Sequence, residues 1–358
     1  MKLVPLCAFL LYIYLPVQAT DSLSIKIGQM IMVGMPGTSV DASSTVIQEI
    51  KQQRVGSVLL FENNINPTNS ISNLNRLCKD LNKAAKIPLF LAIDQEGGKV
   101  NRLKTKYGFE AMPSAQQIGS KDDDSFSVAA SQTIARAVHQ AGMNLNFAPV
   151  VDVESASCPV LGQKQRCYSP SVETIIKIAG FMYEEHRKAG VISCVKHFPG
   201  HGSSTKDSHL GLTDVSKTWQ EEELLPYKQL IADSSVDMIM VAHVVNKKLD
   251  PSGTPASLSK KMIGQLLRKE MNFNGVVITD DMQMHAISNF YGLEQSIKMA
   301  ILAGVDILIF SNNIKGSKDY TAANIHNTIK RLVQRGEISE ERINESFERI
   351  MKLKQKLQ

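Results

Sequence analysis

Short runs of β-branched and apolar residues alternate with longer amphipathic stretches along most of the chain. The strands that this pattern predicts are residues 29–33, 55–61, 88–93, 144–153, 191–197, 238–245, 275–279 and 306–310. Helical segments are expected between and after them, for example at 70–85, 126–140, 172–188, 221–232, 325–335 and 339–358. Alternation of strand and helix is typical of parallel strands joined by right-handed crossovers. Eight such units predict an α/β fold, a single-domain (β/α)8 TIM barrel over residues 20–358.

An open, doubly wound sheet is the alternative arrangement of the same units. Its nucleotide-binding forms carry a Gly-x-Gly-x-x-Gly turn before the first helix or a Gly-Lys-Ser/Thr loop. Neither stands in this sequence, which disfavours nucleotide binding. No linker or low-complexity segment divides the chain, and this favours one domain. The net charge is only +5 and the basic residues are spread along the chain, so no nucleic-acid partner is expected.

The first nineteen residues are typical of a secretory signal. Lys2 supplies a positive end, residues 3–16 an apolar stretch, and residues 17–19 a small-residue cleavage site. The apolar stretch is shorter than the roughly 20 residues that a spanning helix needs, so we expect no stable membrane insertion. An uncleaved anchor remains the alternative. The pattern predicts export, with the protein periplasmic or secreted in an oxidising compartment.

Four cysteines follow the signal, and two of them suggest a disulfide. Cys158 and Cys167 bracket a short loop of proline, glycine and polar residues, and a bridge there would add roughly 2–3 kcal/mol of stability. Two free thiols are the alternative. Cys194 alternates within an apolar run and is expected to lie in the core.

In a TIM barrel the catalytic groups lie at the carboxyl ends of the strands. Polar and titratable residues follow or end the predicted strands at Asp94, Asp152, Lys196-His197, His243, Asp280-Asp281 and Ser311-Asn312. These positions predict a site on one rim of the barrel.

Two of these regions could supply the chemistry. Asp280 leaves a buried strand and could be a nucleophile, or it could cap the next helix. Asp207 and His209 stand two residues apart on an extended loop, so the carboxylate could fix the imidazole tautomer for proton transfer. An Asx turn beside an exposed histidine is the alternative. The spacing of His197, His201 and His209 matches no known ligand pattern, so no metal site is expected.

Binding groups are expected on the same rim. Asp94 and Arg102 flank adjacent glycines and could grip neighbouring hydroxyl groups, the carboxylate accepting and the guanidinium donating. A structural ion pair in a solvated turn is the alternative. Arg166 is a single loop arginine, whose default interpretation is surface charge.

Taken together, three motifs resemble glycoside hydrolase family 3, in particular the bacterial β-N-acetylglucosaminidases of peptidoglycan recycling. They are Lys196–Gly202 with Asp207-Ser208-His209, Asp94–Gly98 with Val100 and Arg102, and Thr279–Met282. Val241–Val244 and Pro255–Ser259 also fit, and the similarity extends over nearly all of the chain after the signal.

The resemblance implies a retaining, two-step hydrolysis without a cofactor. Asp280 would be the nucleophile and His209, held by Asp207, the acid/base, on a loop whose Gly202–Lys206 segment is flexible enough to close over the site. The residues that it implies in binding the terminal sugar are Asp94, Arg102, Arg166, Lys196 and His197. The substrate would be a small saccharide or muropeptide, and we expect a monomer.

Three features depart from the family pattern. Lys99 stands where arginine is usual, the cysteine pair around Arg166 is not general, and the recycling enzymes usually lack a secretory signal. Phosphorolysis of the same glycosides and a non-catalytic cell-wall saccharide-binding role remain alternative functions.

Overall fold

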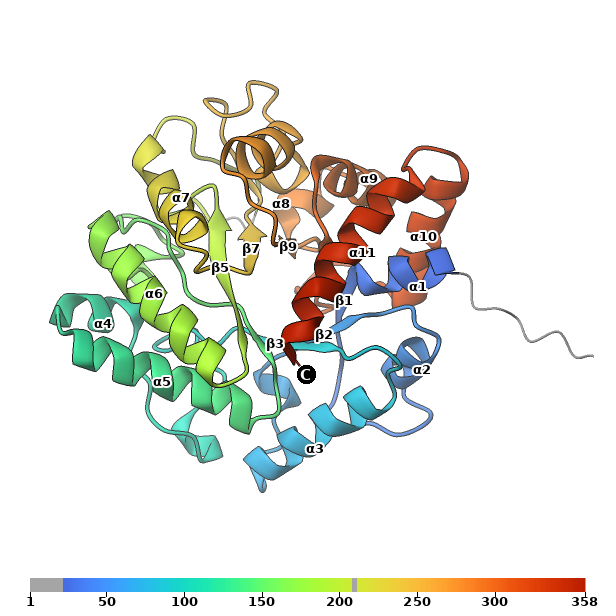
Figure 1. Ribbon diagram of the computed structural model, residues 1–358, viewed down its shortest axis with the longest axis horizontal. Helices are drawn as coiled ribbons and strands as arrows, with labels where there is room; N and C mark the ends of the chain where they lie inside the picture. Colours follow the sequence, from blue (N-terminus) through green and yellow to red (C-terminus); the bar gives the residue numbers. More distant parts are fainter. Residues whose placement is uncertain (1–21, 208–210, 358) are drawn as a thin grey trace, which may run out of the picture.

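The computed structural model describes residues 22–207 and 211–357, and eight parallel strands in this part of the chain close into a barrel (Figure 1). The strands are β1 (Ile31–Gly34), β2 (Ser57–Leu60), β3 (Phe90–Ile93), β4 (Leu145–Asn146), β5 (Ile192–Phe198), β7 (Met238–Val241), β9 (Val276–Asp281) and β10 (Ile307–Phe310). Each pairs with the next along the chain, and β10 closes the barrel against β1. The predicted TIM barrel is therefore confirmed.

Helices surround these strands in Figure 1. They are α1 (Ser22–Gln29), α2 (Thr45–Lys51), α3 (Ser70–Lys83), α4 (Ala115–Lys121), α5 (Asp124–Gln140), α6 (Val172–Lys188), α7 (Leu225–Ala232), α8 (His285–Ser288), α9 (Leu293–Ala303), α10 (Ala322–Gln334) and α11 (Glu340–Lys354), with a π-helical segment at Lys261–Glu270. Helix α6 shows why the sequence folds this way. The Ser171 hydroxyl caps its first turn, and a stripe of apolar residues faces the core: Ile175, Ile178, Ala179 and Met182.

Two predicted strands differ from those observed. The run 144–153 forms a barrel ladder only at Leu145–Asn146, because Pro149 has no N–H to donate. The chain continues beside β5 through a single bridge between Val150 and Lys196, which brings Asp152 close to that strand's end. The run 238–245 divides into β7 and the short β8 (Val244–Val245), which pairs with β6 (Thr213–Asp214) outside the barrel.

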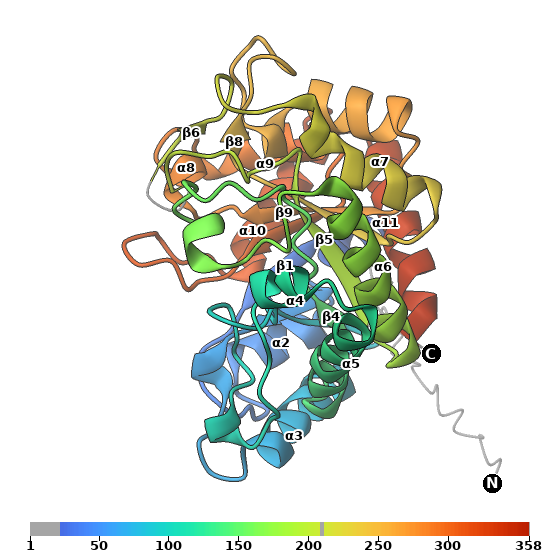
Figure 2. The same ribbon diagram turned by 90° about the vertical axis from the view of Figure 1, so that its left-hand side faces the viewer.

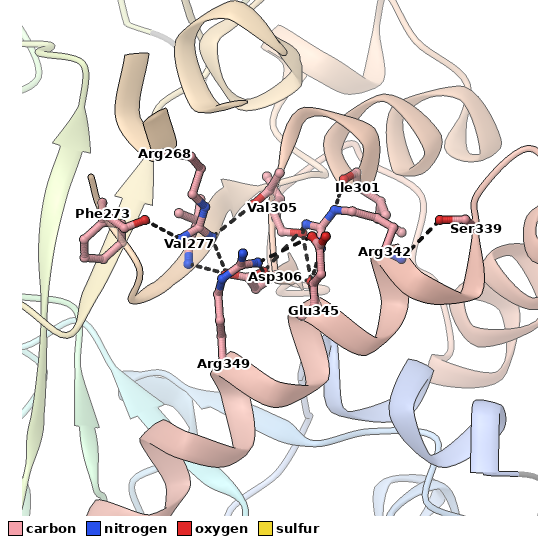
Figure 3. A network of polar contacts seen from close by, with 12 residues as sticks. Arg268, Phe273, Val277, Ile301, Val305, Asp306, Ser339, Arg342, Glu345 and Arg349 are labelled. Atoms are coloured by element: carbon pink, nitrogen blue, oxygen red, sulfur yellow. Dashed lines mark hydrogen bonds and ion pairs between the residues drawn. The ribbon is translucent and has the colours of Figure 1, made fainter. Parts of the chain in front are cut away.

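A cluster of charged groups fixes α11 to the amino-terminal end of the strands (Figure 3). The carboxylate of Asp306 is buried and accepts hydrogen bonds from the Arg268 guanidinium at 2.5 Å and the Val277 N–H at 2.9 Å. From α11, Arg349 donates to the same carboxylate at 3.2 Å and Arg342 lies 3.6 Å away. One buried carboxylate is therefore the shared counter-ion of three converging arginines.

Replacing Asp306 by asparagine should lower the free energy of unfolding by about 3 kcal/mol, because the three guanidinium groups lose their shared buried anion. Urea denaturation of wild type and D306N measures the effect. The control is E345Q, which removes a half-exposed carboxylate that contacts two of the same arginines, Arg342 and Arg349. It should cost less than about 1 kcal/mol, and equal losses in the two variants would contradict the role given to Asp306.

Figure 2 shows β6 and β8 at one end of the barrel and the end of α11 at the other. Among residues 22–207 and 211–357, no helix combines the length and the apolar character needed to cross a bilayer.

Candidate active site

A cavity of about 480 Å³ opens at the carboxyl ends of the barrel strands. Six of the eight site residues that the sequence predicts line it: Asp94, Arg102, Arg166, Lys196, His197 and Asp280. A seventh, Asp207, lies beside it, since its carboxylate is 4.0 Å from the ammonium of Lys164, which also lines the cavity. The eighth, His209, lies outside the described residues.

A buried network of opposite charges forms one wall of the cavity. Lys196, at the end of β5, donates to the Asp94 carboxylate at 2.6 Å and pairs with Glu96 at 2.7 Å. The Arg166 guanidinium binds the two Glu96 oxygens at 2.7 and 2.8 Å. Burial alone would raise the pKa of Glu96, but the charges of Arg166 and Lys196 outweigh it and hold that pKa well below its usual range. Glu96 thus stays ionised and fixes both cations.

His197 is oriented from behind by Asp152. The carboxylate of Asp152 accepts hydrogen bonds from His197 Nδ1 at 2.7 Å and from the His201 backbone N–H at 2.7 Å. Burial would raise the pKa of Asp152, but His197 and His201 lower it, so the carboxylate remains an acceptor. The Nε2 atom of His197 lies 3.5 Å from Arg166 and belongs to the residues that line the cavity. Asp152 therefore sets both the ring orientation and the position of the loop that follows.

The two adjacent aspartates at the end of β9 have different surroundings. Asp281 is buried, and its carboxylate accepts hydrogen bonds from the Ser311 hydroxyl and from the Gln283 N–H at 3.0 Å. Burial raises the pKa of Asp281 to about 6, and the neighbouring Asp280 charge adds to the rise. Asp280 is only partly buried and faces the cavity. Neither caps α8, which begins after Met284, so the capping alternative is wrong.

Arg102 is held by the turn that follows β3. The side chain of Gln95 accepts hydrogen bonds from the backbone N–H groups of Arg102 and Leu103, each at 2.9 Å. Gly97 has a φ of +92°, and a Cβ there would lie 2.3 Å from the Pro113 carbonyl, so the turn requires glycine. The buried Nε atom of Arg102 has no hydrogen-bond partner in this structure. The alternative of a structural ion pair between Asp94 and Arg102 is not observed, since the ion-pair partner of Asp94 is Lys196.

The chain matches the family described as "Glycosyl hydrolase family 3 N terminal domain" over residues 22–353. This chain belongs to glycosyl hydrolase family 3. "Beta-hexosaminidase A" of Pseudoalteromonas piscicida is 32% identical over 86% of this chain and 54% of the relative. "Beta-hexosaminidase" of Tolumonas auensis is 32% identical over 80% of this chain and 84% of the relative.

Solved structures of the family have the same fold. The family 3 β-N-acetylglucosaminidase of a Paenibacillus species superposes with a TM-score of 0.86 at 33% identity, over 94% of this chain and 63% of that one. The chain therefore spans about half of the Pseudoalteromonas relative and 63% of the Paenibacillus protein.

The structure differs from the prediction for the cysteine pair. Cys158 and Cys167 are both free thiols in the structure, so the predicted disulfide is not formed. They are buried in a small apolar cluster with Val150, Val160 and Leu161, and the Cys158 thiol lies 3.6 Å from the His201 carbonyl oxygen. Both cysteines therefore pack in one apolar cluster as separate thiols.

Sequence reasoning placed Asp152 on the rim without a specific role, and it gave no role to Glu96. Glu96 stands just after β3, and Asp152 lies between β4 and β5; position near a strand end was the available signal. Arg166, the partner of Glu96, lies 70 residues further along the chain, and His197, the partner of Asp152, lies 45 residues further. The side-by-side pairing of β3, β4 and β5 brings these pairs together.

Proposed function

We propose that this chain is a retaining, exo-acting β-N-acetylglucosaminidase, which releases terminal N-acetylglucosamine from peptidoglycan fragments or chitooligosaccharides. The observation that carries the proposal is the gathering of Asp280 and five charged or imidazole side chains around one cavity of about 480 Å³. That volume is in the lower part of the range for small-molecule sites, about 300–1,000 Å³, which suits one terminal sugar. The names of its family 3 relatives support the same activity.

In this mechanism Asp280 attacks the anomeric carbon and forms a covalent glycosyl ester while the glycosidic oxygen leaves with a proton. Water then cleaves the ester, and the sugar returns to its starting β configuration. In the proposal, Asp94, Arg102 and Lys196 bind the hydroxyl groups of the sugar, with Arg166 and His197 beside them; all five line the cavity. The ion pairs of Lys196 with Asp94 and of Arg166 with Glu96 keep these groups in position before the substrate arrives.

The proton donor in this proposal is His209, oriented by Asp207. The approach of the Asp207 carboxylate to Lys164, which lines the cavity, supports this assignment. An imidazole with an ordinary pKa of about 6.5 can give and take a proton near neutrality. We further propose that residues 1–19, which lie outside the described residues, direct export to the periplasm or the medium.

The variant H209A should slow hydrolysis of substrates with poor leaving groups on the order of 10²–10⁴-fold, because general acid catalysis is lost. Substrates with acidic phenol leaving groups need little protonation and should be affected much less. Rates for a series of aryl and alkyl N-acetyl-β-glucosaminides measure this difference. The control is H139A, at the exposed end of α5, which should behave like wild type. Equal losses across the series would show that His209 is not the acid.

A phosphorylase is the second candidate, because a histidine acid/base repels incoming phosphate less than a carboxylate does. Added phosphate should leave the rate unchanged and give no sugar 1-phosphate if the enzyme is a hydrolase. A non-catalytic binding protein would bind the saccharides without releasing any product.

A further inference from the structure

A buried glutamate, Glu223, packs against the histidine loop (residues 199–204). Glu223, in the turn Glu221–Leu224 before α7, is only 3% exposed. A Cβ placed on Gly200 would lie 2.7 Å from Glu223 Oε2 and 2.8 Å from its Cβ, so the loop backbone rests directly on this side chain. The indole of the nearby Trp219 donates to the Pro199 carbonyl at 2.9 Å and holds the start of the same loop.

The surroundings of Glu223 do not suit a negative charge. Its Oε1 accepts a hydrogen bond from the Gln220 N–H at 3.3 Å, whereas Oε2 has no partner, and none of the ion pairs found within the described residues involves Glu223. Burial raises the pKa of Glu223 to about 7, and the charge of Asp152 adds to the rise. The hydroxyl and backbone N–H of Ser203 lower that pKa, although Ser203 Oγ and Glu223 Oε2 have no hydrogen-bond partner.

Within residues 22–207 and 211–357, no neighbouring cation pairs with Glu223. His201 in the loop is neutral near pH 7, because burial lowers its pKa to about 4. On α7, the buried Tyr227 hydroxyl has a pKa raised by burial and by Asp152. The ammonium of Lys248 is engaged elsewhere, since it donates to the Trp219 carbonyl at 2.7 Å. Ionised Glu223 would therefore feel the charge of Asp152 with no counter-ion among the described residues.

Asp152 connects this support to the site, since it binds both His197 and the His201 backbone. We propose that Glu223 is a positioning residue for the reaction: as a neutral carboxyl group it supports the histidine loop, and its ionisation loosens the loop. The catalytic consequence rests on the proposed function, whereas the loosening of the loop does not. A carboxyl group whose pKa is higher in the folded state than in the unfolded state loses its stabilising effect as the pH rises toward and through 7.

The test compares wild type, E223Q and E222Q across a pH range centred on 7. E223Q keeps the shape of the neutral side chain and cannot ionise, and E222Q changes the exposed glutamate next to it. Hydrogen–deuterium exchange of peptides covering the histidine loop should become roughly three- to tenfold faster in wild type than in E223Q above pH 7. The ratio of kcat/KM for E223Q to that for wild type should rise over the same range, while E222Q follows wild type.

Loop exchange and pH profiles that coincide in wild type and E223Q would overturn the proposal. So would failure of E223Q to fold, because the neutral side chain must be accepted at this position. If no variant hydrolyses any N-acetylglucosaminide, the proposed function fails, and the exchange experiment still decides the role of Glu223.

Discussion

Replacing Asp280 by alanine is expected to reduce turnover of aryl N-acetyl-β-glucosaminides on the order of 10⁴-fold or more, because the covalent intermediate can no longer form. The fold should be little affected, since Asp280 is partly exposed at the cavity. Steady-state kinetics and thermal unfolding measure the two effects. Added azide should restore part of the rate and yield the α-glycosyl azide, as a small anion takes the place of the missing carboxylate.

The adjacent residue is the matched control for Asp280. Asp281 links β9 to β10 through Ser311, so D281N should lower the free energy of unfolding by about 1–3 kcal/mol. Its loss of turnover should be much smaller than that of D280A. The reverse pattern, with D281N inactive and D280A active, would show that Asp281 is the nucleophile.

The second large effect is expected for E96Q. The glutamine keeps the size of the side chain but leaves Arg166 and Lys196 with one carboxylate fewer in a buried network. Loss of a partner from a buried ion pair costs about 3–5 kcal/mol, part of which should appear as a roughly 10²–10³-fold fall in kcat/KM. Most of that fall should be in KM, since the affected groups bind the sugar and do not react.

Glu110 offers the control for E96Q, because it also forms a two-point contact with an arginine, Arg136, at 3.0 and 3.2 Å. That pair is exposed, so E110Q should change stability by less than about 1 kcal/mol and leave kinetics unchanged. If E96Q behaved like E110Q, the buried network would not organise the site.

The barrel could be predicted from the sequence because its parallel strands are buried on both faces and leave continuous apolar runs. The ends of the predicted strands then indicated which polar residues lie on the rim of the barrel. β4 was predicted too long, since periodicity does not register the missing N–H of Pro149. The partners of Glu96 and Asp152 depend on distances between remote segments, which the pattern along the chain does not contain.

The cysteine pair and Glu223 show the same limit. Spacing alone did not distinguish a bridge between Cys158 and Cys167 from apolar packing of two thiols. Among three consecutive glutamates, 221–223, only the third is buried, and only the folded loop reveals it.

The central claim is retaining cleavage of an N-acetylglucosaminide, and it is tested most directly by proton NMR during early hydrolysis. With an aryl N-acetyl-β-glucosaminide as substrate, the spectrum should show β-N-acetylglucosamine first, followed by its slow conversion to the α anomer. The matching aryl β-glucoside should remain intact. Release of the α anomer first, or equal cleavage of the glucoside, would contradict the account.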